Sequence, residues 1–164
     1  MSIQTVAVLG AGTMGHGIAH VSALAGCSVR LYDLSAEVTE RGMSSIRRNM
    51  DKGVDRGKLD PQARDEGLAR ILATEALEDA VAGADLVVEA VPEKLELKQK
   101  IFRSVEALVG AETILGTNTS SLSIARIASA VSRPERVIGL HFFNPVHIMK
   151  LLEIVVSDST SDAV

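Results

Sequence analysis

Short apolar runs alternate with amphipathic stretches along this chain. The runs show little polar alternation, which is typical of strands buried on both faces of a parallel sheet. They predict strands over residues 5–9, 28–32, 86–91, 113–116, 137–142 and 150–156. Helical periodicity between them predicts helices over residues 12–25, 36–52, 61–70, 95–109 and 124–130. Strands separated by helices form βαβ units, so we expect an α/β fold with a doubly wound, mostly parallel sheet.

Two of the predicted helices follow one another without a strand between them. Ser35 can cap the first, and Asp60 followed by Pro61 is typical of the start of the second. Together they are long for a crossover connection. We therefore expect an antiparallel helical hairpin inserted into the alternation.

A glycine-rich turn joins the first predicted strand to the first predicted helix. Its sequence is Gly10-Ala11-Gly12-Thr13-Met14-Gly15, a complete G-x-G-x-x-G motif. Between a strand and a helix this motif is typical of dinucleotide-binding Rossmann folds. Its glycines permit a tight turn, close approach of a pyrophosphate and close packing of helix on strand, and the helix N-terminus faces the phosphates. A purely structural turn is the alternative.

An acidic residue stands where such folds bind the adenine ribose. Asp33 follows the second predicted strand, and its carboxylate can accept hydrogen bonds from both ribose hydroxyls. The same charge would repel a 2′-phosphate, and only Leu34 and Ser35 follow it. The sequence therefore favours NAD over NADP.

A histidine and a glutamate near the end of the chain are candidates for acid–base chemistry. His141 ends the predicted strand 137–142, at the carboxyl edge where open α/β sheets bind ligands, and histidine can act as a general base near neutral pH. Glu153 lies in an apolar strand that we expect to be buried, where a carboxylate needs a partner. We expect the two side chains to pair, with a structural role for both as the alternative.

The other histidines give no comparable signal. His16 and His20 lie four residues apart on one face of the first helix, but no third ligand is evident, so no metal site is predicted. His147 follows Pro145 in a loop, with nothing nearby in the sequence to activate it.

Composition excludes several classes of protein. The 164 residues include 17 basic and 21 acidic side chains, and a net charge of -4 argues against a nucleic-acid partner. The lone Cys27 supports neither a disulfide framework nor a thiolate metal site. Because no signal peptide and no long apolar run are evident, we expect a cytoplasmic protein without membrane contact, with residues 1–164 forming one domain.

One segment reverses the overall charge. Residues 41–58 hold six basic and two acidic side chains, a local charge of +4. Such a segment suits a polyanionic ligand such as the phosphates of coenzyme A, while a solvated helix face is the alternative.

Several strings together resemble the NAD-dependent L-3-hydroxyacyl-CoA dehydrogenases, of the 3-hydroxybutyryl-CoA type. They run from Asn118-Thr-Ser120-Ser121 through His141-Phe-Phe-Asn144-Pro145 to Met149-Lys150-Leu-Leu-Glu153. The glycine turn and the string Val87-Val-Glu89-Ala-Val-Pro-Glu93 are similar as well. The resemblance covers essentially the whole chain and implies oxidation of 3-hydroxyacyl-CoA by hydride transfer to NAD, in fatty acid β-oxidation.

The resemblance also implies roles for single residues. His141 is then the catalytic base, Glu153 orients its imidazole, and Ser120 contacts the substrate oxygen. The implied cofactor contacts beyond the glycine turn and Asp33 are Glu93, Lys98, Asn118, Ser120 and Asn144. Ser45, Lys52 and Ser120 match positions that contact the acyl-CoA substrate.

Members of this family also carry a helical C-terminal domain that closes the cleft and forms a homodimer. This sequence lacks that domain, and the resemblance implies a cofactor domain truncated before its end. Two other functions stay open: a related dehydrogenase of sugar acids or hydroxy acids, and a non-catalytic, crystallin-like NAD-binding module. The intact His141–Glu153 pair favours catalysis.

Overall fold

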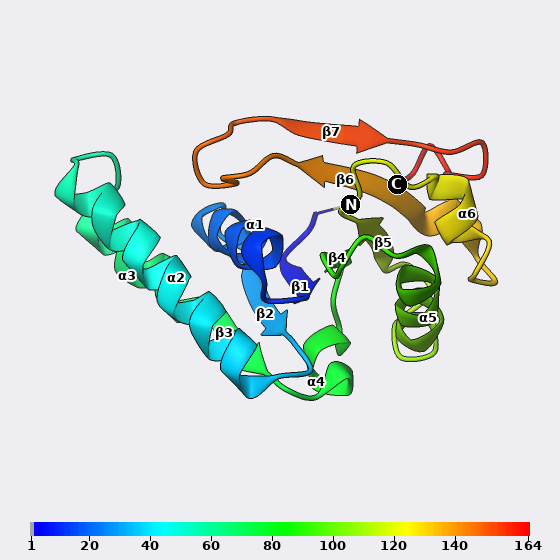
Figure 1. The fold of residues 1–164 in the computed structure, drawn as a ribbon, viewed down its shortest axis with the longest axis horizontal. Coiled ribbons are helices and arrows are strands. Elements are labelled where there is room, and N and C mark those ends of the chain that lie inside the picture. The colour runs from blue at the N-terminus through cyan, green and yellow to red at the C-terminus, as the bar shows by residue number, and fades with distance from the viewer. Residues whose placement is uncertain (1) are drawn as a thin grey trace.

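A seven-stranded sheet runs through the computed structural model, which describes residues 2–164 (Figure 1). The strand order is β3-β2-β1-β4-β5-β6-β7, and every pairing is parallel except that of β6 with β7. The strands are β1 (Thr5–Leu9), β2 (Ser28–Tyr32), β3 (Ile71–Thr74), β4 (Leu86–Glu89), β5 (Ile114–Thr117), β6 (Val137–Phe142) and β7 (Leu152–Val155). The order of β3 to β6 is that of the Rossmann fold, as predicted.

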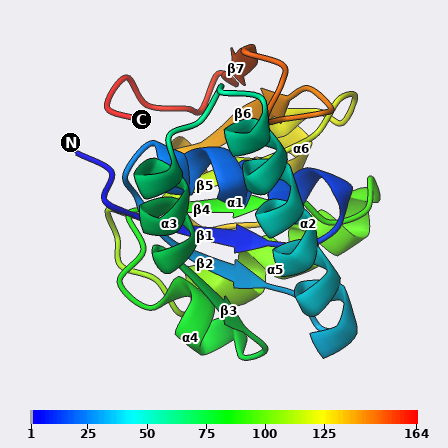
Figure 2. The same ribbon diagram turned by 90° about the vertical axis from the view of Figure 1, so that its left-hand side faces the viewer.

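Helices cover both faces of this sheet. The α-helices are α1 (Thr13–Leu24), α2 (Ala36–Asp55), α3 (Pro61–Ala69), α4 (Leu77–Val81), α5 (Leu95–Glu106) and α6 (Ile124–Ala128). Figure 2 looks onto the layer of α1, α2 and α3, while α4, α5 and α6 lie behind the sheet. Alternate strand residues serve the two layers: Val6 and Val8 pack toward α1, and Ala7 and Leu9 pack toward α4 and α5. None of the helices within residues 2–164 is long and apolar enough to cross a membrane.

The predicted helical hairpin is present as α2 and α3, which pack against each other and connect β2 to β3 along the chain. Ser35 accepts a hydrogen bond from Val38 N at the start of α2, and Asp60 accepts from two backbone N–H groups at the start of α3. The Arg64 side chain joins α3 to Asp51 of α2. The prediction missed the next two elements, β3 and α4. Both are short, and β3 is an edge strand that starts two residues after α3 ends without a turn signal.

The end of the sheet differs most from the prediction. The loop from β6 to β7 contains no crossover helix, so β7 returns antiparallel to β6. All four residues of β7 are exposed, so the expectation of a buried strand around Glu153 was wrong. The strand is also shorter than residues 150–156, and α5 stops before residue 109.

Candidate active site

The glycine turn lies at the carboxyl edge of the sheet, where the strand order reverses between β1 and β4. Gly10 has φ +102°, which glycine alone adopts without strain, and a Cβ there would lie 2.8 Å from Ala90 O. A Cβ on Gly15 would collide with Gly10 O, so α1 approaches the turn closely. Gly12 has nothing within 4 Å of its Cβ position, which leaves its backbone open to a ligand. The turn therefore fits a pyrophosphate at the N-terminus of α1.

A cleft of about 660 Å³ extends from this turn between β2, β4 and α5. Its walls are apolar apart from a few polar groups, which suits an adenosine with its ribose. Sequence reasoning assigned its Gly10, Gly12, Thr13, Met14 and Asp33 but missed the rest. The remaining lining residues are Leu9, Tyr32, Leu34, Val38, Leu77, Ala90, Val91, Pro92, Leu97, Lys100, Ile101 and Ser104.

Asp33 faces this cleft from the end of β2. Its Oδ2 accepts a hydrogen bond from Ala11 N at 2.9 Å, and its Oδ1 accepts from Ser35 N at 3.3 Å. These bonds hold the carboxylate beside the glycine turn, where the sequence placed it. Lys100 lies in the lining of the same cleft, a cation that no sequence pattern predicted there.

His141 and Glu153 pair as predicted, through strand register. They are direct cross-strand partners in β6 and β7, so their side chains meet on one face. His141 Nδ1 donates to Glu153 Oε2 at 2.8 Å, since the ionised carboxylate only accepts. In the tautomer with its proton on Nδ1, the Nε2 atom carries the lone pair, and it lies 3.1 Å from Ser120 Oγ. The Phe143 ring packs against the imidazole of His141, with the two ring centroids 4.3 Å apart.

The turn after β5 that carries Ser120 is held by Glu93. One oxygen of its carboxylate accepts hydrogen bonds from the Thr119 hydroxyl, Ser120 N and Ser121 N. Desolvation raises the pKa of Glu93, but these bonds and the nearby Lys98 outweigh it, so the pKa lies below its usual value. Glu93 is therefore an anion in a cradle of donors at the edge of the site.

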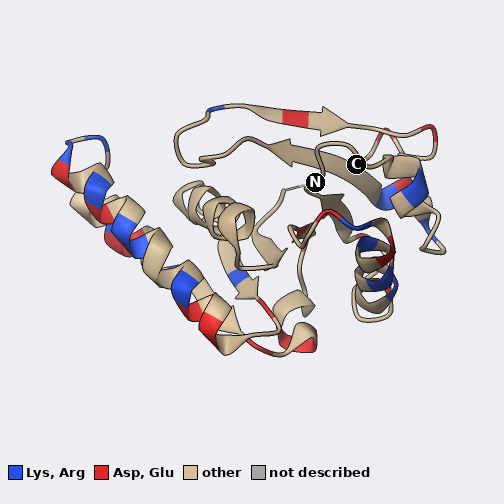
Figure 3. Ribbon diagram, in the orientation of Figure 1, with Lys and Arg blue, Asp and Glu red and all other residues tan. Residues whose placement is uncertain are grey.

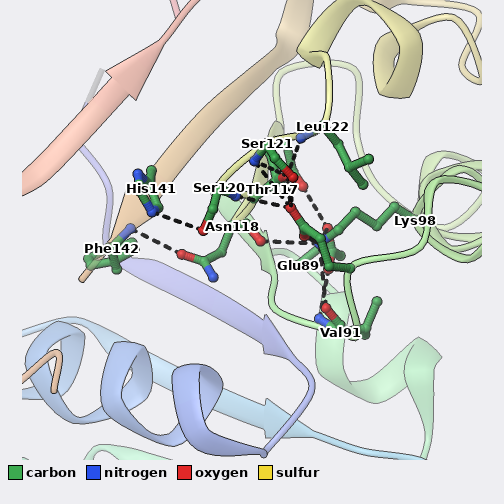
Figure 4. A network of polar contacts seen from close by, with 12 residues as sticks. Glu89, Val91, Lys98, Thr117, Asn118, Ser120, Ser121, Leu122, His141 and Phe142 are labelled. Carbon is green, nitrogen blue, oxygen red and sulfur yellow. Dashed lines mark hydrogen bonds and ion pairs between the residues drawn. The ribbon is translucent and has the colours of Figure 1, made fainter. Parts of the chain in front are cut away.

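Beneath this turn lies an ion pair that is fully buried. Lys98 Nζ of α5 lies 2.7 Å from Glu89 Oε1, and both side chains have at most 1% exposure. Lys98 also donates to Asn118 O at 3.1 Å, and Thr117 Oγ1 donates to Glu89 Oε2 at 2.6 Å (Figure 4). Burial raises the pKa of Glu89, while Lys98, Thr117 and Val91 N oppose that shift. Glu89 received no role from the sequence, although a lone acid at the end of an apolar strand was a usable signal.

The remaining predicted residues surround this centre. Asn118 Oδ1 accepts from Phe142 N at 3.0 Å, so it bridges β5 and β6, and Asn144 is exposed in the loop after β6. Ser45 and Lys52 lie on α2, where basic and acidic side chains are interleaved (Figure 3). No hydrogen bond or ion pair within residues 2–164 joins either of them to the His141–Glu153 pair.

Two of the other three histidines stack on each other, which the sequence did not predict. His20 of α1 stacks on His147 with ring centroids 5.4 Å apart. Among the described residues 2–164, no group of three or more His, Cys, Asp or Glu side chains could hold a metal ion.

A Rossmann sheet with an open glycine turn, an acid at the end of β2 beside that turn and a Ser–His–Glu relay at one edge defines a class of protein, the NAD-binding domain of a dehydrogenase. Residues 5–164 match the family described as the NAD-binding domain of 3-hydroxyacyl-CoA dehydrogenase. The chain belongs to that family.

Individual relatives agree with this assignment. The chain is 47% identical over 161 residues to a 3-hydroxybutyryl-CoA dehydrogenase of Bradyrhizobium diazoefficiens, an alignment that covers 98% of this chain and 55% of the relative. It is 46% identical to the 3-hydroxyadipyl-CoA dehydrogenase of Escherichia coli, covering 94% of this chain and 32% of the relative. The crystal structure of a 3-hydroxybutyryl-CoA dehydrogenase from Escherichia coli superposes with a TM-score of 0.96 at 45% identity, over 99% of this chain and 34% of that one. The chain thus spans about half or less of these relatives.

Proposed function

We propose that the protein interconverts L-3-hydroxyacyl-CoA and 3-ketoacyl-CoA, with residues 1–164 as its NAD-binding domain. The observation that carries this proposal is the relay from Ser120 Oγ through His141 to Glu153, at the same sheet edge as the open glycine turn. A domain that only bound NAD would have no use for this relay. Related enzymes named for 3-hydroxybutyryl-CoA and 3-hydroxyadipyl-CoA support an acyl-CoA as the substrate.

The geometry gives each residue of the relay a task. Because Nδ1 donates to Glu153, Nε2 of His141 is free to take the proton of the substrate's 3-hydroxyl group. Ser120 Oγ lies within hydrogen-bond reach of Nε2 and contacts the same substrate oxygen. Glu153 stabilises the imidazolium that forms. NAD would supply the hydride acceptor, and it would be held by residues 10–15, Asp33, Glu93, Asn118, Ser120 and Asn144.

The coenzyme A portion and the assembly extend the proposal. Ser45 and Lys52 are proposed to contact the coenzyme A phosphates from α2. We also propose that the complete protein is a cytoplasmic homodimer that has no nucleic-acid or membrane partner, as expected from the sequence.

Reduction of acetoacetyl-CoA by NADH tests the proposal directly. We expect turnover by the protein produced from its complete gene. His141→Gln should lower kcat by about 10²–10⁴-fold, because it removes the general base, and leave NADH affinity within about threefold. Activity on a sugar acid or a free hydroxy acid, with none on acetoacetyl-CoA, would instead assign the second enzymatic function. NADH binding without turnover on any of these substrates would indicate a binding module.

A further inference from the structure

The ammonium group of Lys98 has no hydrogen left to donate to a cofactor. Its Nζ lies 2.7 and 2.9 Å from the two oxygens of Glu89, 3.1 Å from Asn118 O and 3.4 Å from Glu93 Oε2. Three N–H groups are thus shared among acceptors within the protein, and the side chain has no exposed surface. A lysine that binds a ligand directly keeps an exposed ammonium group, and Lys98 has none.

The partners of this ion pair all lie at the ends of β4 and β5. Glu89 accepts from Val91 N at 2.7 Å and from Thr117 Oγ1 at 2.6 Å, so it ties both strand ends together. Lys98 holds the backbone of Asn118 by donating to its carbonyl oxygen, and Glu93 accepts hydrogen bonds from Ser120 N and Ser121 N in the same turn. The next contact outward is Ser120 Oγ to His141 Nε2 (Figure 4).

Stability alone gives a weak reason for such a pair. Removing two charges from water is costly, and a buried ion pair can often be replaced by uncharged residues of similar volume without loss of stability. Its geometry does supply what an apolar contact cannot, namely directional bonds to one backbone carbonyl and one hydroxyl at a defined place.

We propose that Glu89 and Lys98 are positioning residues, which fix the turn at residues 117–121 so that Ser120 Oγ faces His141 Nε2. Where it concerns turnover, this inference rests on the proposed function. Lys98 then affects catalysis through Asn118 and Ser120, and it is not a direct contact of the cofactor. A misplacement of about 1 Å at a reacting group can cost on the order of 100-fold in rate, so a turn fixed from below matters for kcat.

The test is the double variant Glu89→Gln/Lys98→Met, which removes both charges and keeps an acceptor for Thr117 or Val91. The matched control is Glu106→Gln/Arg136→Met, the same change in a second, largely buried ion pair that joins α5 to the turn before β6, with its atoms 3.3 Å apart. Glu106 ends α5 and Arg136 precedes β6, so the control pair lies at the opposite edge of the sheet. Both variants remove an ion pair that is shielded from solvent for the most part, but only the first pair lies under Ser120.

The first readout does not depend on activity. In this chain, ¹⁵N NMR of the His141 ring reports whether Nε2 accepts a hydrogen bond. We expect the test variant to move the Nε2 signal toward that of a nitrogen without a hydrogen bond, and the control variant to leave it in place. An unmoved signal in the test variant would overturn the inference, even if the protein had no activity on acyl-CoA substrates.

The second readout separates kcat from binding in the protein made from its complete gene. We expect kcat to fall at least about tenfold in the test variant, with the Kd for NADH within about threefold of the parent. An unchanged kcat with a Kd weakened more than tenfold would make Lys98 a direct cofactor contact and contradict the proposal. If the double variant does not fold, Thr117→Val removes only the hydroxyl bonded to Glu89. It should shift the same NMR signal, and an unmoved signal would again overturn the proposal.

Discussion

At the residue scale, the carboxylate of Asp33 bears on the choice between NAD and NADP. It lies between Ala11 N and Ser35 N at the mouth of the cleft, so its charge stays where an adenine ribose would meet it. We expect NAD to bind more tightly than NADP, because a 2′-phosphate would be repelled there. Calorimetry should show that Asp33→Ala weakens NAD binding. NADP affinity equal to that of NAD in the unmodified protein would contradict the assignment.

Lys100 provides the matched control for that experiment, because it lines the same cleft with the opposite charge. If Asp33 sets the preference, Lys100→Ala should leave the ratio of NAD to NADP affinity within about threefold. A large change in that ratio would make Lys100 the determinant of cofactor choice.

The pair of His141 and Glu153 shows how much residue types alone can predict when the fold is not known. The sequence predicted the partners, but its reason was a buried strand, and β7 is exposed. The true reason is antiparallel register, which makes the two residues direct partners. Glu89 and Lys98 were harder, because no pattern in the chain shows that both side chains point under the turn at Ser120.

At the scale of elements, α2 presents the basic segment. Lys52 and Arg48 are exposed on it, whereas Arg41 at its other end forms an ion pair with Glu37. We expect Lys52→Ala with Arg48→Ala to raise the KM for acetoacetyl-CoA more than the KM for the corresponding pantetheine thioester, because only the full coenzyme carries the phosphates. Arg41→Ala should affect neither. Equal effects on both thioesters would make the segment a solvated helix face.

We expect the contact between α1 and the loop after β6, where His20 stacks on His147, to be sensitive to pH. Burial first, and then the neighbouring His147 and His16, lower the pKa of His20 from 6.5 to about 4. Burial first, and then the charges of His16 and Lys52, lower the pKa of His147 as well. In the unfolded chain, His20 is protonated below about pH 6.5, whereas in the folded chain it is protonated only below about pH 4. The free energy of unfolding therefore falls as the pH decreases from about 6.5 to about 4.

Two and a half pKa units correspond to about 3 kcal/mol for His20 at most. Urea unfolding between pH 7 and pH 4 should show this loss in the unmodified chain. His20→Phe keeps an aromatic ring for the stack but cannot be protonated, so its free energy of unfolding should fall less between pH 7 and pH 4. The contribution of carboxylates such as Glu106 should be the same in both proteins. Parallel curves for the two proteins would show that His20 contributes nothing to the pH dependence.

At the scale of the whole molecule, the 164 residues contain the cofactor cleft and the relay, yet apolar side chains stay exposed around β7. Leu151, Leu152, Ile154 and Val156 are among them, with Ile154 exposed at 64%. The relatives are about twice as long or longer. We expect this chain alone to bind NADH and to associate through that surface.

Turnover by the chain alone should be at least about 100-fold below that of the protein from its complete gene, because an open cleft positions the acyl group poorly. NADH fluorescence titration and acetoacetyl-CoA reduction measure the two properties on one preparation. Equal turnover by both proteins would show that residues 1–164 suffice for catalysis.

The sequence by itself determined the alternation of strands and helices, the glycine turn, Asp33 and the identity of the His–Glu pair. The first three depend on local spacing, because buried strands, caps and phosphate-binding turns leave contiguous patterns. The His–Glu pair was identified from residue type, and only the register of β6 and β7 explains it. The tertiary structure decided the rest: the antiparallel return of β7, the stack of His20 on His147, the place of Lys100 in the cleft and the buried pair beneath Ser120. These depend on which side chains meet across elements far apart in the chain, and strand order and register fix that only after the sheet has formed.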